Sequence, residues 1–166
     1  MPLASLIPVR SDIGLLLEII DRAYNRRSWH GTNLRGSIRG LTAAEAAWRP
    51  AKGRHNISEI VVHSAYWKYA VWRRLTGEPR GSFPLEGSNW FPRPSAEATW
   101  KKDLALLERI HRDLRRAIAK LPAKALGRKA VESKVSNFAL IAGIAAHDLY
   151  HAGQIQLLKR LYRSRR

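Results

Sequence analysis

Four long segments of this chain repeat apolar residues at intervals of three and four, and none shows the two-residue alternation of a β-strand. The segments cover residues 11–27, 56–77, 95–120 and 138–163. A helix with one apolar face must bury that face against another element. The pattern therefore predicts an all-α protein, a four-helix bundle, folded as a single domain over residues 1–166.

Polar residues at the starts of these segments predict where the helices begin. A side-chain oxygen just before the first helical turn can accept a hydrogen bond from a free backbone N–H group. A glutamate three residues later completes a capping box. The candidate caps are Ser11, Thr42 with Glu45 (for a short helix over Ala43–Trp48), Asn56 with Glu59, and Ser95.

Two stretches carry further structural expectations. Residues 138–146 are almost all apolar or small, so the first half of the last helix is expected deep in the core. Residues 78–94 are rich in proline and glycine and predict a long loop. Trp90 and Phe91 lie in this loop, and we expect them to pack on the bundle because exposing them would be unfavourable.

The chain contains no cysteine, which excludes disulfide bonds, thiolate metal ligands and a cysteine nucleophile. Any metal must be bound by His, Asp or Glu, and any thiol must come from a substrate. No apolar run approaches the roughly 20 residues of a membrane span. The N-terminal residues lack the pattern of a secretory signal, so we expect a cytoplasmic protein without membrane contact.

The chain is strongly basic, with 30 Lys and Arg against 13 Asp and Glu and a formal net charge of +17. Such a field attracts anionic small molecules and polyanions, whatever the fold. The densest basic runs lie at residues 112–120 and 159–166, but the excess extends along the whole chain. Two interpretations stay open: nucleic-acid binding, or an arginine-rich composition without a polyanionic partner.

Three of the six histidines lie where two helices can bring them together. His147 and His151 are four residues apart, so they share one helix face with Cβ atoms about 6 Å apart. That face also carries apolar side chains, as does the helix around His63. Buried imidazole nitrogens need partners, and a metal between facing helices supplies one. We interpret these residues as ligands of one metal ion; separate hydrogen-bonded core histidines are the alternative.

Three protein ligands would leave a coordination position open for water or substrate, which is typical of catalytic metal sites. The expected cofactor is one divalent transition metal, and histidine ligands do not distinguish Zn, Ni, Fe, Mn and Cu. Such an ion can act as a Lewis acid or lower the pKa of a bound thiol or water.

The other three histidines receive separate predictions. His111 lies on the charged side of its helix and is expected on the surface. His55 precedes a helix cap and is expected at the rim of the site. His30 follows Trp29 in a glycine-rich connector, where it either lines an entrance or has a structural role; we favour the structural role.

Several neighbours of the histidines are candidates for lining a pocket or orienting a ligand. Gln154 lies one turn beyond His151 and can orient an imidazole or substrate, or be an ordinary surface residue. Glu59 lies one turn before His63, but we favour its capping role. Asp148 is rotated about 100° around the helix from the preceding histidine and is not expected to bind the same ion. The aromatic candidates, for which core packing is the more common role, are Trp29, Tyr66, Trp67, Trp90 and Tyr150. No residue is singled out as catalytic.

These features resemble the DinB/YfiT-like metalloenzyme family, which includes the DNA-damage-inducible DinB proteins. The resemblance covers nearly the whole chain. The family's metal ligand on the second helix matches His63, and its two ligands on the fourth helix match His147 and His151. Three stretches carry the resemblance: WHGTNLRGSIRGLTAAEAAWRP, GRHNISEIVVHSAYWKYAVWRRL and IAAHDLYHAGQIQLLKR.

The resemblance implies an up-down-down-up bundle, usually a homodimer, with a three-histidine metal site at the mouth of a pocket. Characterised relatives are thiol-dependent transferases or isomerases that use bacillithiol, mycothiol or glutathione. For this chain the resemblance implies that a metal-bound thiolate attacks an electrophile.

Three functions fit these observations. The first is a metal-dependent enzyme, a thiol transferase or a hydrolase, that acts on a small and anionic substrate with a low-molecular-weight thiol as co-substrate. The second is a nucleic-acid-binding or stress-response protein with a structural metal; the charge favours it, but no DNA-reading motif is present. The third is a non-catalytic module that binds a metal or small ligand. We favour the first.

Overall fold

The computed structural model describes residues 11–165. Within this range the chain is helical and has no β-strand, as predicted, and a single isolated bridge joins Lys129 and Ser136. The four predicted helical segments correspond to the four longest helices. The elements are α1 (Asp12–Tyr24), α2 (Leu34–Ser37), α3 (Ala43–Ala47), α4 (Ile57–Thr76), α5 (Glu97–Lys120), the 3-10 turn η1 (Ala123–Ala125) and α6 (Asn137–Ser164).

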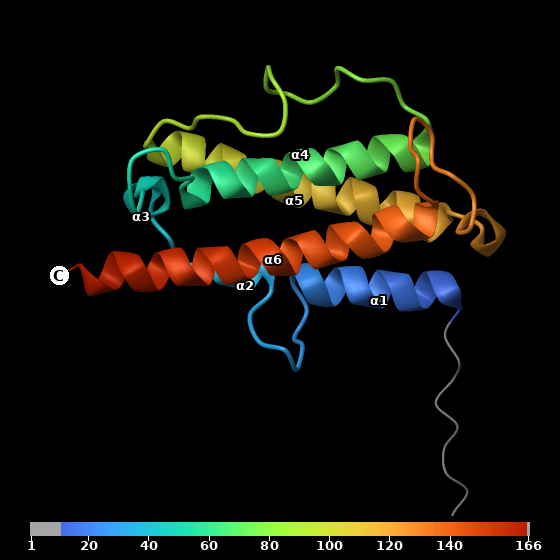
Figure 1. Cartoon of the computed structure of the whole chain (residues 1–166), viewed down its shortest axis with the longest axis horizontal. Coiled ribbons are helices and arrows are strands. Elements are labelled where there is room, and N and C mark those ends of the chain that lie inside the picture. The colour runs from blue at the N-terminus through green and yellow to red at the C-terminus, as the bar shows by residue number, and fades with distance from the viewer. Residues whose placement is uncertain (1–10, 166) are drawn as a thin grey trace, which may run out of the picture.

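The four long helices lie along the long axis of the molecule (Figure 1). In this view α1 and α6 run in one direction, whereas α4 and α5 run in the opposite direction. The main packing pairs are α4 with α5 and α1 with α6, and α4 also packs against α6. The long connection after α4 leads back along the outside of the bundle, so α5 can run parallel to α4. As a result α4 and α6 face each other as antiparallel neighbours.

Three of the four predicted caps are confirmed. In each, a side-chain oxygen accepts a hydrogen bond from a backbone N–H group in the first turn of α1, α3 or α4. Both predicted capping boxes have their reciprocal hydrogen bonds, which satisfy two backbone donors at each helix start. The confirmed caps are Ser11, Thr42 with Glu45, and Asn56 with Glu59.

The predicted cap at Ser95 is wrong. Helix α5 begins at Glu97 after Ala96, and no side chain caps it. The Glu97 carboxylate instead accepts a hydrogen bond from the backbone N–H of Ala43 at 3.1 Å. The carboxylate at the start of α5 therefore joins this helix to α3.

Two apolar clusters fill the bundle. One lies among α4, α5 and the second half of α6, includes Leu107 and Ile155, and is closed by the short helices α2 and α3. The other lies among α1, the end of α5 and the first half of α6, and includes Ile20 and Ile141. Burial of these side chains from water provides the main driving force for packing the helices.

A buried ion pair joins α4 to α6. The Nζ atom of Lys68 lies 2.5 Å from Oδ2 of Asp148, and neither side chain is exposed. The Tyr24 ring of α1 lies 5.0 Å from the same Nζ. Burial raises the pKa of Asp148 to about 6, although the Lys68 charge opposes that shift. Because a buried charge is costly without its partner, this pair favours one relative position of α4 and α6.

The prediction that His111 lies on the surface is wrong. Its side chain is only 2% exposed, and its ring stacks on Tyr24 with 3.6 Å between ring centroids. Burial lowers the pKa of His111 to about 2, so the ring is neutral. The sequence pattern showed one apolar stripe on α5, but α1 and α4 both pack on this helix and bury a wider face.

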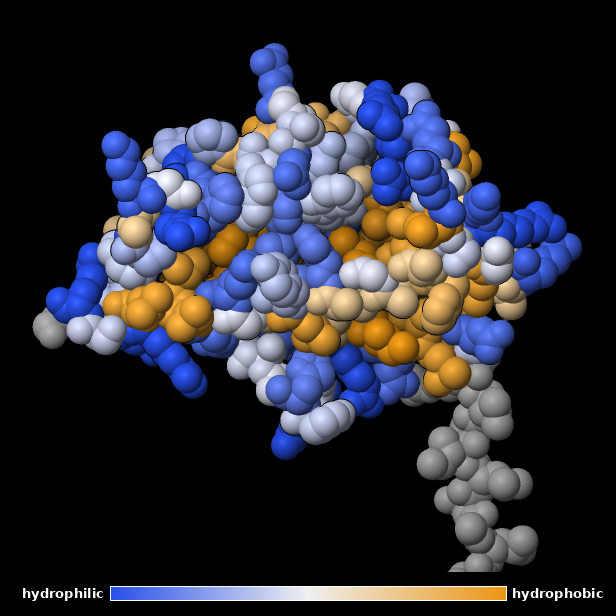
Figure 2. Space-filling view, in the orientation of Figure 1, coloured by the Kyte–Doolittle hydropathy of each residue, from blue (hydrophilic) through white to orange (hydrophobic). Residues whose placement is uncertain are grey.

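The first half of α6 is less buried than predicted. Ile141 and Ile144 are in the core, but Phe138 is 51% exposed and Gly143 is also exposed. Figure 2 shows apolar surface over this half of α6. The expectation failed in part because α6 packs chiefly on α1 and α4 there, and its outer side faces solvent.

The long loop packs on the bundle, as predicted. Phe91 is buried and lies in an aromatic group with Tyr66 and Phe83. The backbone N–H of Ser82 donates a hydrogen bond to the Tyr69 hydroxyl of α4 at 3.2 Å. The loop is therefore held against α4 at Ser82, Phe83 and Phe91.

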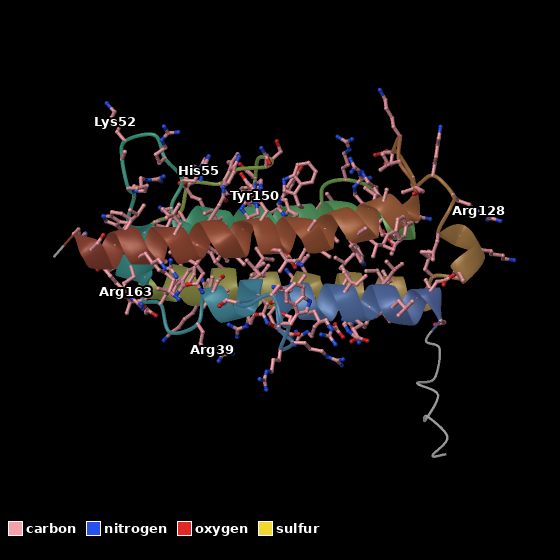
Figure 3. All side chains as sticks on the ribbon, turned by 60° about the horizontal axis from the view of Figure 1, so that its bottom comes forward. Arg39, Lys52, His55, Arg128, Tyr150 and Arg163 are labelled. Carbon is pink, nitrogen blue, oxygen red and sulfur yellow. The ribbon has the colours of Figure 1, made fainter. Side chains whose placement is uncertain are left out.

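Basic side chains project from several sides of the molecule. Figure 3 shows Arg39, Lys52 and Arg128 pointing away from different parts of the bundle. The positive charge is therefore distributed around the described structure and does not form a single stripe. Among the helices of residues 11–165, none combines the length and the apolar character needed to cross a membrane.

Substitution of Lys68 by methionine tests the role of the buried pair. Lys68→Met is expected to lower the free energy of unfolding by about 3–5 kcal/mol, because Asp148 becomes an unpaired buried charge. The control Asp113→Ala breaks the more exposed pair with Arg116 and should cost less than about 1 kcal/mol. Urea denaturation followed by circular dichroism measures both variants. If Lys68→Met lowers the free energy of unfolding no more than the control does, the buried pair does not stabilise the packing of α4 against α6.

Candidate metal centre

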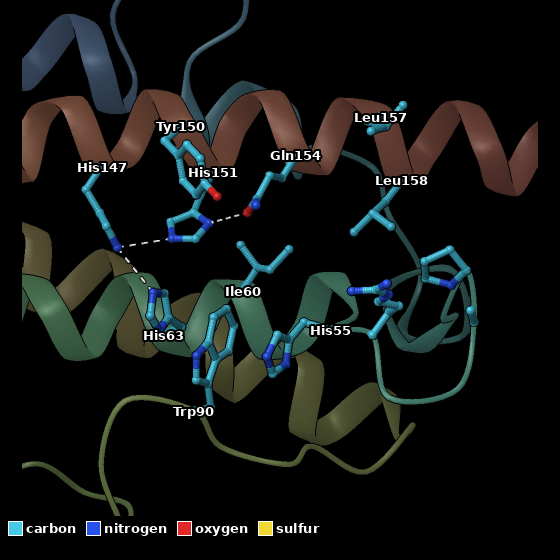
Figure 4. A pocket seen from close by; sticks show the side chains of 13 residues that line it. His55, Ile60, His63, Trp90, His147, Tyr150, His151, Gln154, Leu157 and Leu158 are labelled. Atoms are coloured by element: carbon cyan, nitrogen blue, oxygen red, sulfur yellow. Dashed lines mark hydrogen bonds between the residues drawn. The ribbon is translucent and has the colours of Figure 1, made fainter.

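Three imidazole rings meet between the middle of α4 and the middle of α6 (Figure 4). The Nε2 atom of His147 lies 3.2 Å from Nε2 of His63 and 3.1 Å from Nε2 of His151. The three candidate ligand atoms all lie within 4.8 Å of one another. Two nitrogens bound to one ion at about 2.0–2.1 Å are roughly 3.3 Å apart in tetrahedral geometry. The structure thus brings the three predicted ligands together at a spacing compatible with one ion.

Hydrogen bonds on the outer side of two rings orient their nitrogens. Nδ1 of His63 donates to the backbone carbonyl of Asn89 at 2.8 Å, and Nδ1 of His151 donates to Oε1 of Gln154 at 2.7 Å. Since an amide oxygen only accepts hydrogen bonds, each Nδ1 carries the proton. Each Nε2 therefore directs a lone pair toward the centre, which is the arrangement that a metal ligand requires.

Asn89 is part of the site but was not identified from the sequence. Its φ of 66° lies in the left-handed region, which asparagine tolerates better than most residues. Its carbonyl holds His63, and its side-chain oxygen accepts a hydrogen bond from Trp67 Nε1 at 2.9 Å. The only sequence signal was an asparagine in a long loop just before Trp90, which does not predict where its carbonyl points.

All three rings are neutral near pH 7. Burial lowers the pKa of His147 to about 3, and the neighbouring histidines add to that effect. Burial also lowers the pKa of His151 to about 4 and that of His63 below its usual value. Neutral imidazole is the form that binds metal ions, so protons compete little for these nitrogens at neutral pH.

The surroundings of His147 indicate that a cation fits this centre. Its Nδ1 atom is buried and has no hydrogen-bond partner, while its Nε2 faces two other Nε2 atoms. A proton on Nε2 could satisfy only one of those neighbours, and a proton on Nδ1 would leave three lone pairs pointing at each other. A buried polar group without a partner costs about 1–3 kcal/mol. One divalent transition metal would accept all three lone pairs.

A stack of aromatic rings borders the centre. Trp90 lies between His63, at a centroid distance of 3.9 Å, and His55, at 3.6 Å. Nδ1 of His55 lies 3.0 Å from a carboxylate oxygen of Glu59, which also pairs with Arg49. Glu59 therefore caps α4 and anchors His55 at the rim, consistent with the capping role favoured from the sequence.

The three histidines line a pocket of about 640 Å³ (Figure 4). Its walls are mainly apolar, and its lining residues in the described chain include no carboxylate. Arg54 and His55 are exposed at the pocket rim. Arg54 was not among the residues predicted from the sequence to line the pocket. The remaining lining residues are Pro50, Ala51, Ile60, Trp90, Tyr150, Gln154, Leu157 and Leu158.

Three of the other predicted site residues, Trp90, Tyr150 and Gln154, line this pocket. Tyr66 and Trp67 do not: Tyr66 lies in the aromatic group under the loop, and Trp67 lies on the other side of the histidines. Trp29 and His30 are exposed in the connector between α1 and α2 and are not among the lining residues. The exposed position of His30 does not confirm the structural role favoured from the sequence.

The fold and this centre define a helical protein with a candidate three-histidine metal site. The chain matches the family model of the DinB superfamily over residues 26–155. This span includes all three histidines and most of the chain, so the protein belongs to the DinB superfamily. No curated protein and no solved structure matches the chain significantly.

Substitution of Gln154 tests the outer hydrogen bond. Gln154→Leu removes the acceptor for the Nδ1 proton of His151 and is expected to weaken metal binding about 10- to 100-fold without unfolding the protein. Gln154→Glu keeps an acceptor and should restore most of the affinity. Gln156→Leu, two residues along α6 and outside the pocket, is the matched control. Competition with a chromophoric chelator measures the Kd, and equal Kd values in all four proteins would rule out this role.

Proposed function

We propose that this DinB-superfamily protein is a metal-dependent enzyme that joins a low-molecular-weight thiol to a small, anionic electrophile. The convergence of three neutral imidazole nitrogens at an open pocket carries the proposal. His63, His147 and His151 would hold the ion. When bound, a divalent ion lowers the pKa of a coordinated thiol and polarises an electrophile. Three protein ligands are typical of catalytic sites, which keep a position for substrate.

The protein's own residues would position the substrates. Gln154 and the carbonyl of Asn89 keep two imidazoles in the metal-binding tautomer. Ile60, Leu157 and Leu158 give the pocket apolar walls, which can bind the apolar part of a substrate. A thiol entering the pocket would therefore meet a centre whose ligands are already oriented.

The composition of the pocket favours thiol transfer over hydrolysis. Metal-dependent hydrolysis commonly uses a carboxylate as general base for the attacking water, as in the zinc proteases. No Asp or Glu is among the residues that line the pocket in the described chain. A thiol has a pKa near 8.5 and needs less help than water to become a nucleophile.

The charge around the pocket supports an anionic substrate. Arg54 stands at the mouth, and within residues 11–165 no carboxylate forms an ion pair with its guanidinium group. The net charge of +17 adds a long-range attraction for anions. Because the basic side chains are distributed around the bundle, we do not extend the proposal to nucleic acid. The homodimer and the cytoplasmic location remain predictions.

A panel of thiols tests the proposed activity. The metal-loaded protein is mixed with chloroacetate, a small anionic electrophile, and, in turn, with glutathione, cysteine, bacillithiol or mycothiol, and formation of the thioether with release of chloride is followed by mass spectrometry. At least one thiol is expected to react faster than without protein, and His151→Ala should lose about 100-fold or more of that rate, as expected when a metal ligand is removed. His30→Ala is the control and should keep the full rate.

Two results would contradict the proposal. One is no rate above the uncatalysed reaction with any thiol, although the metal is bound; this would favour a metal- or ligand-binding module. The other is an unchanged rate in His151→Ala, which would show that the reaction does not use the candidate centre.

A further inference from the structure

A second hollow, which we name the far groove, lies between α4 and α6 next to the histidines. Its volume is about 160 Å³, and His147 lines both this groove and the main pocket. The main pocket lies toward the start of α4, and the far groove lies toward its end. The candidate metal centre therefore stands between two cavities. The other lining residues are Trp67, Val71 and Arg74 of α4, and Ala139, Leu140, Gly143 and Ile144 of α6.

Small residues on α6 keep the far groove open. Ala139, Gly143 and His147 follow each other at intervals of four and share one helix face. A Cβ atom added to Gly143 would meet no other atom within 4 Å, so a side chain there has free space to enter. The surface over this half of α6 is apolar (Figure 2). The wall of the groove therefore suits an apolar part of a ligand.

The side chain of Arg74 lines the far groove, and it also borders the cavity between α4 and residues 80–88 of the long loop. Its Nε atom is buried and has no hydrogen-bond partner, and in residues 11–165 no carboxylate forms an ion pair with it. The preceding residue, Arg73, differs because it pairs with Glu132 at 3.0 Å. A buried guanidinium N–H without an acceptor is unfavourable, and a carboxylate matches this group with two parallel hydrogen bonds. Arg74 can therefore bind the anionic group of a ligand, because no described residue of the protein pairs with it.

The spacing between Arg74 and the histidines defines the length of such a ligand. Arg74 follows Trp67 by seven residues, which is about 10 Å along a helix. Trp67 contacts His147 edge to face, with 6.4 Å between ring centroids, and is held by its hydrogen bond to Asn89. The backbone positions of Arg74 and Trp67 are therefore about 10 Å apart along the axis of α4, and a ligand that contacts both Arg74 and His147 would have a length of this order.

We propose that the far groove binds a narrow, mainly apolar molecule with a terminal carboxylate, whose carboxylate contacts Arg74 and whose other end lies at His147. This inference rests on the proposed function for its biological meaning, because the molecule would be the electrophilic substrate and the main pocket would take the thiol. The binding site itself depends only on Arg74 and the open wall at Gly143.

Isothermal titration calorimetry of the full-length protein with octanoate tests the site. Octanoate combines an apolar chain with one terminal carboxylate, and 1-octanol is the neutral probe of the same length. We expect octanoate to bind more tightly than 1-octanol. Arg74→Gln and Gly143→Leu should each weaken octanoate binding at least tenfold, the first by removing the cation and the second by filling the groove.

Two control variants show whether the loss of octanoate binding is specific to the far groove or follows from any loss of positive charge or any larger side chain on α6. Arg112→Gln removes an exposed arginine of α5, and Ala146→Leu enlarges an exposed small residue of α6 that does not line the groove. Both should bind octanoate as the wild type does. Circular dichroism checks that each variant is folded, and replacing glycine inside a helix should not lower its helical content.

The metal-site variant His151→Ala separates this inference from the proposed function. Octanoate binding that persists in His151→Ala and still depends on Arg74 would support the groove even if no thiol transfer is detected. Binding that is lost in His151→Ala but unchanged in Arg74→Gln would show that the carboxylate binds the metal, and would overturn the proposal. Octanoate binding no tighter than that of 1-octanol would also overturn it.

Discussion

The buried pair between Lys68 and Asp148 is the interaction on which the arrangement of α4 against α6 depends. Asp148 directly follows His147, and Lys68 comes five residues after His63, so the pair and the candidate ligands lie on the same stretch of both helices. A slip between the helices would separate two buried charges at a high cost. The pair therefore restricts α4 and α6 to the register in which the three imidazoles meet. His147 and Asp148 are adjacent in α6 but point about 100° apart. His147 can therefore face the other histidines while Asp148 pairs with Lys68.

The candidate centre is also organised by contacts that involve no metal. The carbonyl of Asn89 and the side chain of Gln154 hold two rings, and Trp90 stacks on His63. A ligand set that is already oriented loses little conformational freedom on binding an ion, so more of the binding free energy is retained. The apolar main pocket and the far groove then lie on either side of an oriented centre, which is the geometry that a reaction between two substrates needs.

The sequence predicted what depends on local periodicity. The four long helices, three of the caps and the inward faces of the histidines follow from residue spacing within one segment. The features that sequence reasoning missed depend on contacts between segments. His111 is buried because α1 covers part of α5, and the carbonyl of Asn89 reaches His63 only because the long loop folds back over α4. The pairing of Lys68 with Asp148 likewise needs the helix register, which a single sequence does not specify.

The metal content of the protein, purified without a histidine tag, is the most direct test of the three-histidine centre. Elemental analysis would compare the wild type with His151→Ala and with the exposed-site control His30→Ala. If the three histidines hold the ion, the wild type and His30→Ala will each contain about one equivalent of a divalent transition metal, and His151→Ala will contain much less. Negligible metal in all three proteins, even after incubation with Zn, Ni, Fe or Mn and removal of excess ion, would contradict this prediction.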